Sequence, residues 1–94
     1  MQISQSQELE DGRQTYAIGR IKAVGAWRAA DAAGSEADRR TALNALIREA
    51  EDCGADAIVA VDFQMDGVTG ADIDGVALKR VVATGVAVRF ALAA

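Results

Sequence analysis

The chain has 94 residues and a formal net charge of -4, and 51% of it is hydrophobic although only 4% is aromatic. An acidic chain lacks the basic surface that nucleic-acid binding requires, and no stretch approaches the ~20 apolar residues of a membrane span. We therefore expect neither nucleic acid nor a membrane as a partner. The single Cys53 and the absence of a leader pattern predict a cytoplasmic protein without an internal disulfide.

The N-terminal part of the chain predicts extended structure. Residues 2–4 suit a minor edge strand, and residues 14–24 are rich in β-branched and aromatic side chains, which predicts a long strand. Gly19 interrupts that pattern and indicates a bulge. Arg20 and Lys22 are two residues apart and share one face. We expect them, like Lys79 and Arg80 of the last strand, to pair with carboxylates across the sheet or across a subunit boundary.

The strongest local signal is a helix between Ser35 and Gly54. Ser35, with Asp38 three residues on, matches a capping box, and Gly54 suits the left-handed position that ends a helix. Before the helix, the alanine-rich passage around Trp27 is interpreted as a loop or an extra helical turn. One apolar stripe follows steps of three and four residues along the helix: Leu43, Leu46, Ile47, Ala50 and Cys53.

Because Cys53 lies on this stripe, we expect its side chain to be buried. Replacing Cys53 by serine would then place a hydroxyl in an apolar site and lower the free energy of unfolding by roughly 1 to 3 kcal/mol.

Two further strands follow the helix. Residues 57–66 alternate, with apolar side chains on one face and polar ones on the other: Val59, Val61, Phe63 and Met65 against Asp62, Gln64 and Asp66. Residues 67–75 are rich in glycine and aspartate and predict a mobile hairpin connection. The last strand, 76–90, is longer than its partner, so we expect an unpaired apolar edge at residues 86–90 that drives association into a closed homo-oligomer.

Together these elements predict an α+β fold. Residues 1–94 are expected to form one domain, a single β-α-β-β subunit with an antiparallel sheet and one main helix, which associates into a closed ring.

Four short motifs then carry a family resemblance: Leu9-Glu10-Asp11-Gly12, Tyr16-Ala-Ile-Gly19, Gly54-Ala-Asp-Ala57 before a valine-rich strand, and Gly85-Val-Ala-Val88. With them the chain resembles the YbjQ-like family, small bacterial and archaeal proteins labelled as heavy-metal-binding domains. The resemblance implies a β-α-β-β subunit, a pentameric ring and no established catalytic activity. Dodecin-like flavin-binding proteins share the strand order, but they place a flavin-stacking aromatic on a strand, whereas Trp27 precedes the helix.

The chain offers few side chains that could bind a heavy metal ion. Soft metals prefer thiolate, imidazole or thioether groups, and the chain has one cysteine, no histidine and two methionines. A site within one subunit is therefore not expected. Cys53, Glu49 and Asp56 are the candidate metal ligands if symmetry-related chains bring several thiolates together.

The acidic residues between Asp62 and Gly67 do not indicate a catalytic or calcium-binding site. Asp62 to Gly67 resembles the first half of a calcium loop, but Ile73 stands where the bidentate acid belongs, so an acidic turn is the preferred interpretation. Asp62 and Asp66 share a strand face, yet no set of nucleophile, base and orienting group accompanies them. We assign no catalytic residue and expect no cofactor.

The sequence thus favours a non-enzymatic, ring-forming homo-oligomer that acts as a binding or scaffold protein for an unidentified small molecule or metal ion. Two alternatives stay open. One is heavy-metal binding at symmetry-related Cys53 thiolates, and the other is a small enzyme whose site lies between subunits.

Overall fold

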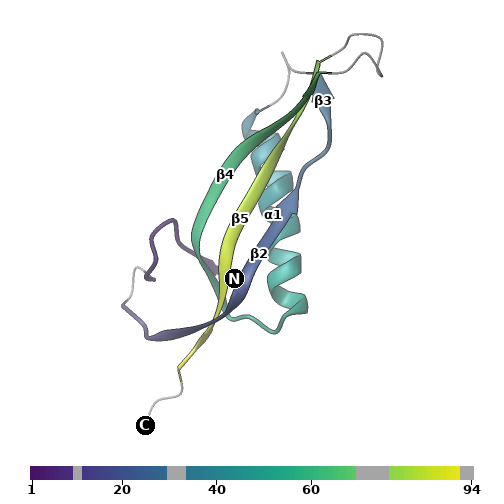
Figure 1. Cartoon of the computed structure of the whole chain (residues 1–94). Coiled ribbons are helices and arrows are strands. Elements are labelled where there is room, and N and C mark those ends of the chain that lie inside the picture. The colour runs from purple at the N-terminus through teal and green to yellow at the C-terminus, as the bar shows by residue number, and fades with distance from the viewer. Residues whose placement is uncertain (10–11, 30–33, 70–76, 92–94) are drawn as a thin grey trace.

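The computed structural model describes residues 1–9, 12–29, 34–69 and 77–91. Its elements in chain order are β1 (Gln2–Ile3), β2 (Thr15–Val24), β3 (Arg28–Ala29), α1 (Glu36–Asp52), β4 (Ala57–Thr69) and β5 (Ala77–Phe90). The long strands form one sheet, and α1 lies across one of its faces (Figure 1). The predicted α+β class and the order of the long elements, β-α-β-β, are confirmed. No helix among the described residues combines the length and apolar character needed to cross a membrane.

β5 is the central strand of the sheet. The strand order is β1-β4-β5-β2, and β5 pairs antiparallel with β4 from Ala77 to Val88 and with β2 from Val82 to Phe90. β4 continues past the predicted end at residue 66, because Gly67 stays in the ladder opposite Lys79. Val86 and Val88 therefore have partners on both sides, and the expected unpaired edge is wrong for residues 86–88. Arg89 and Phe90 pair with β2 but have no cross-strand partner in β4.

Two short strands also differ from expectation. β1 pairs with β4 in parallel, so the sheet is mixed and not purely antiparallel. Arg28 and Ala29, next to Trp27, form β3 and pair with Lys79 and Leu78 of β5, where a loop or helical turn was expected. The sheet of one chain is open and does not close on itself. The predicted ring would therefore have to form between several chains.

Helix α1 begins and ends where its caps predict. The Asp38 N–H donates to Ser35 Oγ at 3.1 Å, while Asp38 Oδ2 accepts from the N–H of Gly34, one residue earlier than in a standard capping box. Gly54 follows the helix with φ of 77°. The apolar stripe is confirmed for Leu46 and Ala50, which are fully buried against the sheet.

A bulge in β4 controls which side chains face the helix. The β4–β5 register shifts between Val59 and Asp62, and Ala60 there adopts a positive φ of 53°. As a result both Ile58 and Val61 pack into the core under α1, whereas Val59 packs on the other side with Leu9 and Val88. The predicted sharing of one face by Val59 and Val61 is wrong for this reason. The smaller bulge predicted at Gly19 is confirmed by a register shift between Ala17 and Gly19.

The N-terminal segment satisfies the backbone groups that the β4 bulge exposes. The N–H groups of Ala60 and Val61 donate to the carbonyls of Ser6 (2.7 Å) and Ser4 (3.1 Å). Ser4 is buried, and its Oγ donates to the Glu8 carbonyl at 2.8 Å. Because buried amides without partners are costly, this segment is part of the folded sheet and stabilises the bulge.

Gly85 faces the bulge across the ladder, and we expect Gly85→Ala to destabilise the fold. A Cβ at this position would lie 2.6 Å from Ile58 Cγ2 and 3.3 Å from the Val59 carbonyl oxygen. The overpacking should lower the free energy of unfolding by about 1 to 3 kcal/mol in urea titrations. Gly19→Ala is the matched control, because a Cβ there meets nothing within 4 Å; equal losses in both variants would contradict this account.

Candidate functional site

The face of the sheet opposite α1, called here the open face, carries a polar hollow of about 490 Å³. The hollow is lined by Arg20, Ile21, Lys22, Ala60, Asp62, Gln64, Thr84, Gly85 and Val86. Alternation along the strands explains the polar members of this lining, because Ala23, Val61 and Ala83 pack in the core under the helix and their neighbours Lys22, Asp62 and Thr84 point away from it. Cations therefore line the β2 side of the hollow, and a carboxylate and an amide line the β4 side.

Lys22 and Asp62 occupy the same row of the open face. Each is the cross-strand partner of Thr84, one from β2 and the other from β4. Among the described residues, neither Lys22 nor Arg20 forms an ion pair within 4.0 Å. The expected pairing of Arg20 and Lys22 with carboxylates is thus not made inside the described part of the chain, and pairing across a subunit boundary stays a prediction.

The second carboxylate of the open face is already neutralised. Arg80 contacts Asp66 Oδ2 through Nη2 at 3.0 Å and Nε at 3.2 Å, and its guanidinium lies 4.4 Å from the centroid of the Trp27 ring. Asp62 Oδ1 instead accepts the N–H of Phe63 at 2.9 Å. Asp62 and Asp66 therefore have different partners and do not form a pair of free carboxylates of the kind that acid–base catalysis uses.

The calcium-loop motif takes the form of a strand over its described part. Residues 62–67 belong to β4, and an extended backbone spaces the side chains of Asp62, Gln64 and Asp66 about 6.5 Å apart along one face, so these oxygens do not surround one ion. The rest of the motif, including Ile73, and the predicted mobile connection at residues 70–75 lie outside the described residues.

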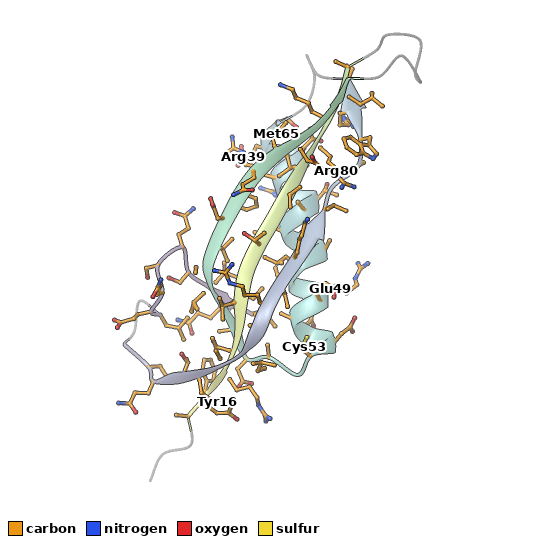
Figure 2. The ribbon with its side chains drawn as sticks, viewed as in Figure 1. Tyr16, Arg39, Glu49, Cys53, Met65 and Arg80 are labelled. Atoms are coloured by element: carbon orange, nitrogen blue, oxygen red, sulfur yellow. The ribbon has the colours of Figure 1, made fainter. Side chains whose placement is uncertain are left out.

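Cys53 is exposed, contrary to the prediction that it packs on the sheet. It is the C-cap residue, one position beyond the last helical residue Asp52, and Ala50 is the last residue of the helix that is buried against the sheet. Its backbone N–H donates to the carbonyls of Glu49 and Ala50, while the side chain reaches solvent near the end of α1 (Figure 2).

The other candidate ligands do not complete a metal site with Cys53 in one chain. Glu49 is exposed one turn earlier on α1, and Asp56 Oδ2 accepts the N–H of Phe90 at 2.8 Å. In the described part of the chain, no three histidine, cysteine, aspartate or glutamate side chains lie close enough together to hold a metal ion. A soft metal also prefers more thiolate or imidazole ligands than one chain provides.

The two long edges of the sheet are the feature that sequence reasoning missed. β2 ends the sheet on one side, and on the other side β1 pairs with β4 only at Ala57 and Ile58. Among the described residues no strand pairs with the outer edge of β2, or with β4 from Asp62 to Thr69. Large apolar side chains are exposed on both edge strands: Tyr16 (53%), Ile18 (40%) and Val24 (41%) on β2, and Met65 (47%) on β4.

Comparison with known proteins places this fold in a family. The chain belongs to the YbjQ-like family, whose model, described as "Putative heavy-metal-binding", matches residues 24–91. It is also similar to the crystal structure of a protein of unknown function from the DUF74 family of Pediococcus pentosaceus. The two share 14% identity with a TM-score of 0.67, over 97% of this chain and 98% of that one, so this likeness shows the fold alone. No curated protein matches.

We expect Cys53→Ser to change the free energy of unfolding by less than about 0.5 kcal/mol, because the thiol is exposed and the helix cap uses backbone groups. Ala50→Ser, three residues earlier and fully buried, is the comparison, with an expected loss of about 1 to 3 kcal/mol. Urea titration measures both, and a native thiol that resists Ellman's reagent would contradict the exposure of Cys53.

Proposed function

We propose that this chain is the subunit of a closed homo-oligomeric ring that serves as a non-enzymatic binding or scaffold protein. The observation that carries the proposal is the pair of unpaired edges, on β2 and on residues 62–69 of β4, which lie on opposite sides of one sheet. A subunit of this kind has two different surfaces that each invite strand pairing.

The exposed apolar side chains favour closing these edges against other copies. Tyr16, Ile18, Val24 and Met65 are between 40% and 53% exposed. Complete burial of a large apolar side chain contributes on the order of 1.5 to 3 kcal/mol, so burying the exposed part of each one against a neighbour contributes about 1 kcal/mol. Head-to-tail contacts either polymerise or close into a ring, and a soluble product requires closure. The family resemblance supports five subunits.

The chemistry of the described residues supports a role in binding without catalysis. The chain has no histidine, its exposed Cys53 belongs to no group of three candidate metal-binding side chains among the described residues, and Asp66 is held by Arg80. No described set of residues combines a nucleophile, a base and an orienting group, which covalent or acid–base catalysis needs. The polar hollow of the open face is the surface on which the ring would present a ligand site.

Metal handling at Cys53 is the second candidate function, and one observation favours it. The thiol is exposed, so thiolates of several copies are free to share a soft metal ion, in keeping with the description of the family. The residues of one chain do not fit such an ion, as described above.

Native mass spectrometry after zinc or copper exposure separates the two candidates. For the scaffold role we expect the same oligomer mass, without retained metal, for wild type and for Cys53→Ser. Metal that the wild type retains through desalting and that Cys53→Ser loses would favour metal handling instead.

Light scattering on a sizing column tests the ring. We expect wild type to elute as one closed oligomer, and Ile18→Lys or Met65→Lys to shift it toward smaller species, because a desolvated lysine at a packed edge is costly. Asn44→Lys adds the same charge to the exposed surface of α1 and should leave the oligomer unchanged. A wild-type monomer at micromolar concentration would refute the proposed ring.

A further inference from the structure

The two free edges run in the same direction. β2 and β4 are each antiparallel to β5, and therefore parallel to one another. In a ring whose axis follows the strands, the β2 edge of one copy thus meets the β4 edge of the next copy in parallel pairing. This inference rests on the ring proposed above, in which residues along the two edges must favour this contact over contacts between two identical edges.

The edges carry opposite charges on the open face. On β2, Arg20 and Lys22 are exposed and lack an ion pair among the described residues. On β4, Asp62 and Asp66 are exposed, and Asp66 is paired with Arg80. Of these two carboxylates, Asp62 is the one without an ion pair among the described residues, and it lies in the same row as Lys22.

We propose that the β2 edge docks against the β4 edge of a second copy of this chain, with Lys22 of one copy pairing with Asp62 of the next. Opposite charges on neighbouring strands stabilise the contact. The same charges act against symmetric dimers, because β2 against β2 opposes Arg20 and Lys22 to cations, and β4 against β4 opposes carboxylates to carboxylates. Charge therefore selects the head-to-tail contact, and only such contacts close into a ring with more than two members.

Charge reversal tests this contact. Lys22→Glu alone and Asp62→Lys alone each place like charges at every junction, and each should raise the concentration at which half of the protein is assembled by about tenfold. Lys22→Gln removes the charge without reversing it and should give a smaller shift in the same direction. The matched controls are Arg48→Glu and Asp52→Lys, which change exposed charges on α1 and should leave assembly as in wild type.

Mixing the two reversed variants gives the decisive result. At junctions between unlike variants, the introduced glutamate faces the introduced lysine or the native pair forms, so the equimolar mixture should assemble at a clearly lower concentration than either variant alone. In a ring of five at least one junction joins two identical variants, so the recovery should fall short of wild type, whereas the double variant on one chain restores opposite charges at every junction. Light scattering at 50 mM and at 500 mM salt measures each sample, and circular dichroism verifies that each variant is folded. The wild-type ring should also weaken at the higher salt, because screening acts on exposed pairs.

Three results would overturn the inference. If the mixture assembles no better than either single variant while the double variant on one chain assembles, Lys22 and Asp62 act within one subunit across Thr84. If a wild-type ring forms and neither reversal shifts its assembly, the charges do not select the contact, although the proposed ring stands. If wild type is a monomer, the ring and the inference both fail.

Discussion

The fold depends on the close approach of β4 to β5 at the Ala60 bulge. One extra residue in β4 turns Ile58 and Val61 toward the same face, where both pack under α1. Without it, the alternation of β4 would be shifted by one residue beyond this point, and the carboxylates of Asp62 and Asp66 would point into the core. Gly85 permits this arrangement, because a side chain there would enter the space that Ile58 fills. The polar open face and the apolar helix face thus follow from one backbone irregularity.

Local signals made the helix and the long strands predictable. Ser35 and Gly54 mark the ends of α1 through hydrogen bonds and backbone angles that involve only near neighbours in the chain. The bulge at Gly19 is likewise a local property of glycine in a strand. Features set by distant partners could not be predicted in the same way. Gly67 remains in β4 because β5 is beside it, and β1 is parallel because the segment after it bonds to the bulge.

In the candidate site, too, the residue types could be predicted from the sequence, whereas their positions in space could not. The residue types of Cys53, Glu49 and Asp56 suggested metal chemistry, but a helical stripe cannot show that Cys53 lies one position past the helix, where its side chain is exposed. The charges on Arg20, Lys22 and Asp62 were visible in the sequence as single residues. Their placement on opposite edges of one sheet required the strand order, which depends on contacts between segments far apart in the chain.

The position of β5 in the sheet also constrains how the chain is made. β5 comes last among the strands in chain order, yet it is the partner of β2, β3 and β4. During synthesis these earlier strands leave the ribosome with apolar side chains and free backbone groups, and they have no strand to complete the sheet until β5 follows. The sheet therefore forms after translation of this region, and the nascent chain is exposed to wrong pairing and to chaperones in that interval.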